Sequence, residues 1–94
     1  MSMVQELEEF QGLSQLVGRF SEAMRARLWE KMATGLKGWA DAKRRNEILN
    51  NMRDRLSVSV TEYLAGDINK LVDIANLTAI LWLHELERKA ESKT

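Results

Sequence analysis

The chain has 94 residues, which is enough for one small domain. Apolar residues make up 45% and charged residues 30% of it, a composition typical of a soluble folded protein rather than a disordered one. The absence of cysteine excludes disulfides, thiolate metal sites and cysteine nucleophiles. The absence of proline, together with only five glycines, favours a few long helices.

The formal charges cancel, since there are fourteen basic and fourteen acidic residues. This balance argues against a dedicated nucleic-acid-binding protein. The charge is nevertheless unevenly spread, with a net charge of −3 over residues 1–18, +5 over residues 19–55 and −2 over residues 56–94. The basic middle segment is either a solvated helix face or a surface for a partner, and a protein is favoured over a nucleic acid. The candidate partner-binding residues in this segment are Lys43, Arg44 and Arg45.

No apolar stretch approaches the roughly 18 residues that a membrane-spanning helix needs. The longest apolar run, residues 74–83, is interrupted by Asn76. The first residues lack the basic start and the apolar centre of a signal peptide. We therefore expect a cytoplasmic protein without a membrane partner.

The N-terminal part of the chain has an amphipathic pattern and two glycines. Residues 1–20 are predicted to form a short helical extension, with Gly12 and Gly18 in or beside it. Ser21 is a good N-cap, so a separate helix is predicted over residues 21–34. The apolar residues of the extension are Val4, Leu7, Phe10, Leu13, Leu16 and Val17.

The remaining elements follow in chain order. Residues 35–39 are predicted to form a loop, and apolar residues at steps of three and four predict a helix over residues 43–65. Residues 57–61 alternate between apolar and polar side chains, so a strand is conceivable there, but the longer helical period is favoured. Gly66 ends this helix, and a last helix is predicted over residues 67–89.

The expected fold class is all-α, a small helical bundle built on a long antiparallel helical hairpin. Residues 1–94 form one domain, with its bundle in residues 21–89 and a tail in residues 90–94. The last helix is apolar almost all round between residues 71 and 86, and one small bundle cannot bury every side of a helix. We therefore expect a homodimer or a larger homo-oligomer. The predicted oligomer interface consists of Leu77, Ile80, Leu81 and Trp82.

Residues equally far from an antiparallel turn lie roughly opposite each other, so Glu62 is expected to face Lys70 across the turn at Gly66. The same reasoning places one carboxylate beside two cations at the centre of the hairpin. A magnesium site needs several carboxylate oxygens and no competing ammonium group. The hairpin centre is therefore interpreted as a charge-neutralised core formed by Arg55, Lys70, Asp73 and Asn76.

The order of these segments resembles a known family. Lys37-Gly38-Trp39, an amphipathic helix, Gly66-Asp67 and the segment V-D-I-A-N-L at residues 72–77 are similar to the MazG-like all-α nucleotide pyrophosphohydrolases, above all to the small versions common in bacteriophage genomes. The similarity covers roughly residues 24 to 86. The resemblance implies an all-α fold and hydrolysis of nucleoside triphosphates to a monophosphate and pyrophosphate. It also implies Mg²⁺ held by acids in an E-E-x-x-E stretch on one helix and an E-x-x-D stretch on the next.

This chain departs from that acidic pattern. The first stretch falls on residues 54–58 and the second on residues 70–73, and of the five acidic positions only Asp54 and Asp73 are still acidic. Neither the basic nor the apolar replacements can ligate a cation. The resemblance thus implies a vestigial site made of Asp54, Arg55, Val58, Lys70, Asp73 and Asn76.

Three functions stay open on the sequence. The favoured one is a non-catalytic MazG-like protein that binds another macromolecule, for example a phage-encoded inhibitor of a host enzyme or defence complex. The alternatives are a weak Mg²⁺-dependent pyrophosphohydrolase, with Glu62 and Asp54 in a shifted metal site, and a nucleotide or phosphate binder that uses Arg55, Lys70 and Lys37. His84, the only histidine, is expected to be structural. No catalytic residue is assigned, and no cofactor is expected outside the Mg²⁺-dependent alternative.

Overall fold

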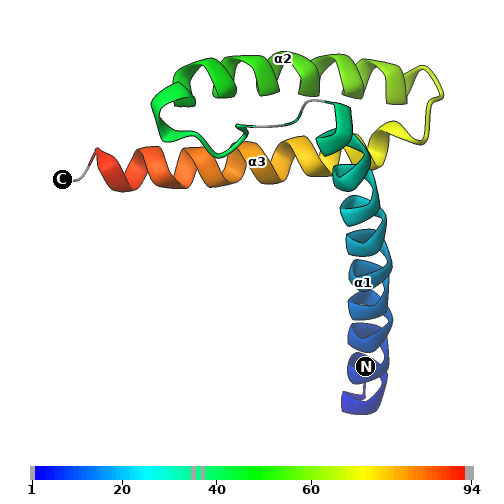
Figure 1. Ribbon diagram of the computed structural model, residues 1–94. Coiled ribbons are helices and arrows are strands. Elements are labelled where there is room, and N and C mark those ends of the chain that lie inside the picture. The colour runs from blue at the N-terminus through cyan, green and yellow to red at the C-terminus, as the bar shows by residue number, and fades with distance from the viewer. Residues whose placement is uncertain (1, 35, 37, 93–94) are drawn as a thin grey trace.

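The computed structural model describes residues 2–34, 36 and 38–92. These residues form three α-helices and one short 3₁₀ helix, with no strand among them, which confirms the all-α prediction. The helices α2 and α3 pack against each other and run in roughly opposite directions, whereas α1 leads away from them (Figure 1). The elements are α1 (Met3–Thr34), η1 (Ala42–Arg44), α2 (Arg45–Leu64) and α3 (Lys70–Glu91).

The helix α1 is continuous, so the predicted division into an extension and a separate helix starting at Ser21 is wrong. Ser2 and Gln5 start the helix with a reciprocal pair of hydrogen bonds between the side chain of each and the backbone N–H of the other, 3.2 Å and 3.1 Å long. Gly12 and Gly18 lie inside the helix, where each costs only about 1 kcal/mol relative to alanine. Glycine weakens a helix but does not end one unless the backbone turns left-handed there.

A left-handed backbone does occur between α2 and α3. Gly66 has a φ of +115°, and its N–H donates to the carbonyl of Tyr63, so the last turn of α2 is closed there. The side chain of Asp67 accepts a hydrogen bond from the N–H of Asn69, 3.1 Å away, and shapes the turn that leads into α3. The short connection brings the chain back along α2, and residues 57–61 are helical rather than a strand.

The apolar core is small and lies between α2 and α3. Leu77 and Leu81 pack against its buried members, together with Leu36 from the segment before η1. The predicted oligomer interface therefore needs correction, because Ile80 is buried inside the chain, and of the four residues only Trp82 is exposed, by 65%. Part of the apolar surface of α3 faces α2 and is covered within the chain, so a second copy is not needed to bury it. The buried apolar residues are Ile48, Leu49, Met52 and Ile80.

A buried polar cluster joins the start of α2 to the end of α3. His84 has no exposed surface, and its Nδ1 lies 3.3 Å from Nε of Arg45, while its Nε2 contacts the carbonyl oxygen of Trp39. The Arg45 guanidinium also pairs with Glu87 and Glu91 on α3, and the bond with Glu91 is the main reason that its pKa is raised. The structural role expected of His84 is confirmed. The prediction that Arg45 lies on an exposed partner surface is wrong, because these acids hold it in a buried position.

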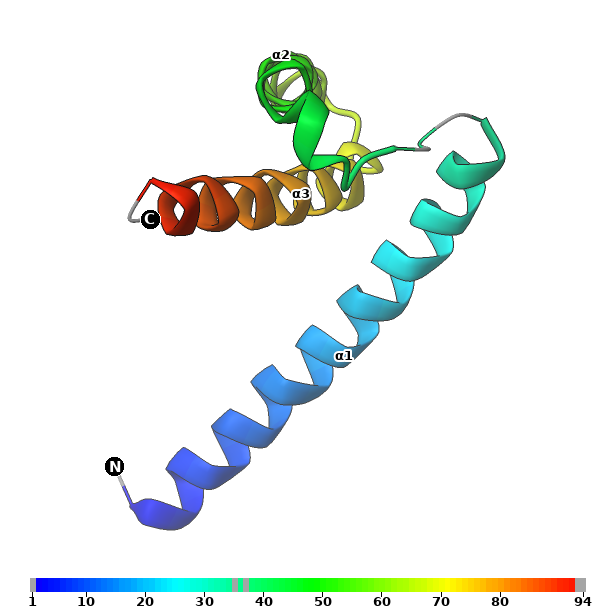
Figure 2. The same ribbon diagram turned by 60° about the vertical axis from the view of Figure 1, so that its left-hand side comes forward.

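The N-terminal part of α1 extends into solvent. Every residue from Ser2 to Phe20 is exposed, and the helix points away from α2 and α3 in both views (Figures 1 and 2). The Cα radius of gyration is 16.6 Å, against about 12 Å for a compact chain of this length. Within the described residues, no helix combines the length and apolarity needed to cross a bilayer.

The position of Ile80 in the core can be tested directly. We expect Ile80→Ala to lower the free energy of unfolding by about 2–5 kcal/mol, because it leaves a cavity between α2 and α3. Trp82→Ala, on the exposed side of the same helix, should lower it by less than about 1 kcal/mol. Urea unfolding followed by circular dichroism, at one protein concentration, measures both. Equal losses would place Ile80 outside the core.

Candidate functional site

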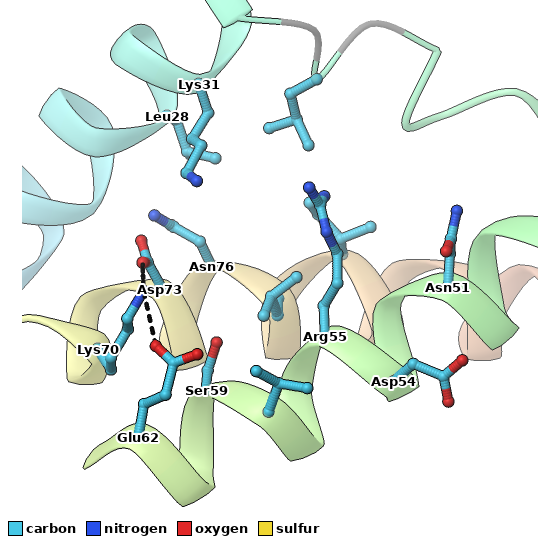
Figure 3. A pocket seen from close by; sticks show the side chains of 14 residues that line it. Leu28, Lys31, Asn51, Asp54, Arg55, Ser59, Glu62, Lys70, Asp73 and Asn76 are labelled. Carbon is cyan, nitrogen blue, oxygen red and sulfur yellow. Dashed lines mark ion pairs between the residues drawn. The ribbon is translucent and has the colours of Figure 1, made fainter. Parts of the chain in front are cut away.

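The end of the molecule where all three helices meet contains a cavity of about 320 Å³ (Figure 3). The walls come from the last turns of α1, from α2 and from the first half of α3, with Leu36 completing them. The volume lies at the lower end of the range for small-molecule sites. The structure brings the six residues of the predicted vestigial site together around this cavity: Asp54, Arg55, Val58, Lys70, Asp73 and Asn76.

Asp73 is the most enclosed acid of the cavity, with 14% of its side chain exposed. Its Oδ1 accepts a hydrogen bond from Nε of Arg27 on α1, 2.9 Å away, and its Oδ2 lies 3.9 Å from Nζ of Lys70. The bond with Asp73 is the main reason that the pKa of Arg27 is raised above its ordinary value. Arg55 was the predicted second cation beside Asp73. Arg27 takes that place instead, and Arg55 forms no ion pair with any described residue.

Glu62 and Lys70 form the ion pair that the hairpin geometry predicted. The Nζ of Lys70 lies 3.0 Å from a carboxylate oxygen of Glu62, and this bond raises the pKa of the ammonium group. Both side chains point into the same corner of the cavity as Asp73 (Figure 3). The ammonium group of Lys70 therefore interacts with two carboxylates, that of Glu62 on α2 and that of Asp73 on α3.

These pairings bear on whether the site can hold Mg²⁺. The ion prefers several carboxylate oxygens in octahedral geometry. Asp73 and Glu62 already form ion pairs with basic side chains. The carboxylate of Asp54 points away from both of them (Figure 3). No three acidic or histidine side chains converge anywhere in the described part of the chain. The residues present do not fit a magnesium ion, nor do they form the shifted site with Glu62.

Two cations and one buried hydrogen-bond acceptor in the cavity are not paired with any described residue. Arg55 and Lys31 extend into the space between α2 and α1 (Figure 3), and neither forms an ion pair with a described residue. Asn76 is 6% exposed, and its Nδ2 donates to the carbonyl of Met24, 3.2 Å away. Its Oδ1 is buried and has no hydrogen-bond donor among the described residues. Such an orphaned acceptor is rare in folded proteins, and a bound donor group would satisfy it.

The contribution of α1 to this site could not be predicted from the sequence. Arg27, Leu28 and Lys31 reach the cavity only because the last turns of α1 pack on α3. The partners of Arg27 and Asn76 are 46 and 52 residues away along the chain, so no local spacing signals them. Lys37, assigned to phosphate binding, lies outside the described residues.

Comparison of the chain with protein-family models, with curated proteins and with solved structures returned no match.

Proposed function

We propose that the chain is a non-catalytic protein on a MazG-like helical scaffold and that it acts by binding another macromolecule. The observation that carries this proposal is the pairing of two of the three cavity acids with cations, Asp73 with Arg27 and Glu62 with Lys70, while the carboxylate of Asp54 points away from both. Hydrolysis through a metal requires acids that are free to ligate it and to position water. Where the resembling family has acids, this chain has cations and an apolar residue.

The ion pairs also explain how the scaffold keeps its shape without a metal. A partly buried carboxylate such as Asp73 is costly unless a cation or hydrogen-bond donor neutralises it. Arg27 and Lys70 supply those groups from two helices. The helices around the cavity thus pack as a metal-binding site would require, but the cations occupy the carboxylates that would hold the metal.

The exposed basic residues before α2 support a partner surface. Lys43 is exposed, and Arg44 is half exposed and paired with Glu47 at 2.9 Å. Charges at such positions chiefly raise the rate of association with an acidic partner. Arg45 is not part of this surface because it is buried. For a phage-borne gene, an inhibitor of a host enzyme or of a defence complex is the use we propose.

Pyrophosphate release is the direct test of the non-catalytic assignment. With nucleoside triphosphates and Mg²⁺ we expect release at the uncatalysed background, equal to that of Asp73→Asn, because no acid cluster holds the metal. The triple variant Arg55→Glu, Val58→Glu and Lys70→Glu should gain Mg²⁺ binding in calorimetry if the MazG-like alignment is right. Magnesium-dependent release that disappears in Asp73→Asn would contradict the proposal.

Partner capture tests the binding role. We expect the immobilised full chain to retain a specific protein from a bacterial host lysate. The pair Lys43→Glu and Arg44→Glu should slow its association about tenfold at low salt, with a smaller effect at high salt. Arg53→Glu with Lys89→Glu makes the same charge change at other exposed positions and serves as the control. Equal slowing by both pairs, or no specific capture, would contradict this surface.

A second candidate function is supported by the leftover groups of the cavity. Arg55 and Lys31 provide two cations without ion pairs, and Asn76 provides an acceptor without a donor. Charged and polar groups of this kind, set among apolar walls, suit a nucleotide or phosphate ligand bound without turnover. Of the residues assigned to this role from the sequence, Arg55 remains available, whereas Lys70 is engaged with Glu62.

Calorimetry with nucleotides in the absence of metal tests this second function. We expect Arg55→Met to weaken any binding by about tenfold or more, because a charge-assisted hydrogen bond contributes about 1.5–3 kcal/mol. Arg53→Met, which removes an exposed arginine of the same helix that pairs with Glu85, should leave binding unchanged. No heat with any nucleotide, or equal effects of the two variants, would exclude the cavity as a nucleotide site.

A further inference from the structure

The cavity separates α1 from α2. Both helices pack on α3, and the cavity lies in the space between them (Figure 3). Leu28 and Lys31 line it on the α1 side, and Arg55 and Val58 line it on the α2 side. A ligand in this cavity would therefore contact two helices that each pack mainly on α3.

Two positive charges of the cavity are not neutralised by its walls. Lys31 and Arg55 extend into the same space from α1 and α2 (Figure 3), and neither forms an ion pair with a described residue. Asp73 and Glu62 are already engaged with other cations, and the carboxylate of Asp54 points away from both. Like charges that share one partly enclosed space repel each other, and apolar walls strengthen the repulsion because they lower the local dielectric constant. An anion between the two side chains would replace this repulsion by attraction.

The two cations match a phosphoryl group better than a carboxylate. A phosphate monoester carries a charge of about −1.5 to −2 at neutral pH, whereas a carboxylate carries a single charge. The planar guanidinium of Arg55 can bind two phosphate oxygens at once, and the ammonium group of Lys31 can bind the third. Lys31 is half-buried and Arg55 is exposed, so an anion from solution can reach both.

Asn76 adds a buried hydrogen-bond acceptor to the same cavity. Its side chain lines the cavity, and the residue is only 6% exposed. Its Nδ2 donates to the carbonyl oxygen of Met24, which can only accept, so the amide cannot be turned round. The buried atom without a partner among the described residues is therefore Oδ1. Since buried acceptors are almost always paired, a hydroxyl group of the ligand is the complementary donor.

The volume of the cavity limits the size of the ligand. About 320 Å³ corresponds to roughly ten water molecules at about 30 Å³ each. A ligand with about ten non-hydrogen atoms fills such a space, whereas a nucleoside triphosphate is larger.

We propose that the cavity binds a small hydroxylated phosphate monoester without a metal, and that the phosphoryl group bridges Lys31 on α1 and Arg55 on α2. This ligand class rests on the second candidate function, which is ligand binding without turnover. The bound phosphoryl group holds α1 on a second side, because α1 is then joined to α3 by packing and to α2 through the ligand.

Calorimetry with the full chain, in phosphate-free buffer containing a chelator, tests the ligand class. We expect glycerol 3-phosphate to bind with a dissociation constant on the order of 0.1 mM, which suits a ligand of about ten non-hydrogen atoms. Propyl phosphate has the same carbon chain without the hydroxyl groups. It should bind about tenfold more weakly, because Oδ1 of Asn76 then stays unpaired. ATP should also bind more weakly than glycerol 3-phosphate, since it exceeds the cavity.

Matched variants test the bridge between the two helices. Lys31→Met and Arg55→Met should each weaken the binding of glycerol 3-phosphate by about tenfold or more, since each removes a charge-assisted hydrogen bond. Arg25→Met and Arg53→Met remove exposed arginines of the same two helices that do not line the cavity, and they should leave binding unchanged. Circular dichroism should show the same helicity for all four variants.

Three results would overturn the proposal, and they separate it from the second candidate function. The first is no heat with glycerol 3-phosphate. If ATP then binds without metal, a nucleotide function remains, and if ATP does not bind, both fail. The second is unchanged affinity in Lys31→Met, which would leave binding without turnover but exclude the bridge. The third is equal affinity for glycerol 3-phosphate and propyl phosphate, which would place Asn76 outside the site.

Discussion

The buried contact between Arg45 and His84 determines how the rest of the chain can pack. A backbone carbonyl only accepts hydrogen bonds, so Nε2 of His84 must donate to Trp39, and Nδ1 is left to accept from Arg45. This contact ties the turn before η1, the start of α2 and the end of α3 to one point. With both helices fixed there, Met52 and Ile80 meet in the core and the opposite end is free to form the cavity.

Features set by local chemistry could be predicted from the sequence. The helices α2 and α3 follow from apolar residues at steps of three and four, and the turn follows from Gly66, which adopts the left-handed backbone that other residues avoid. Once the turn is placed, the pairing of Glu62 with Lys70 is a matter of counting residues outward along two antiparallel helices. The grouping of the six residues of the predicted vestigial site around one cavity has the same origin, because they all lie on this pair of helices.

Features set by contacts between distant segments could not be predicted. Arg45 lies in a run of basic residues that local reasoning places in solvent, and only the acids of α3 explain its burial. Arg27 was not connected with Asp73 because nothing in the pattern tells which part of α1 packs on α3. The helix α1 is continuous through its two glycines because a glycine costs only about 1 kcal/mol relative to alanine, which is too little to interrupt a long helix.

The helix α1 links the cavity to the exposed N-terminal arm of the molecule, because one continuous element carries both. Its last turns supply Arg27 and Lys31 to the cavity walls, while the residues of its first five turns are all exposed. A helix is stiff along its axis, so whatever holds the free part of α1 also restricts the orientation of Arg27 against Asp73 and of Met24 against Asn76. The exposed arm and the shape of the cavity are then mechanically connected. Only four apolar side chains are buried among the described residues, so the core is small and the packing of the last turns of α1 on α3 adds to what holds the helices together.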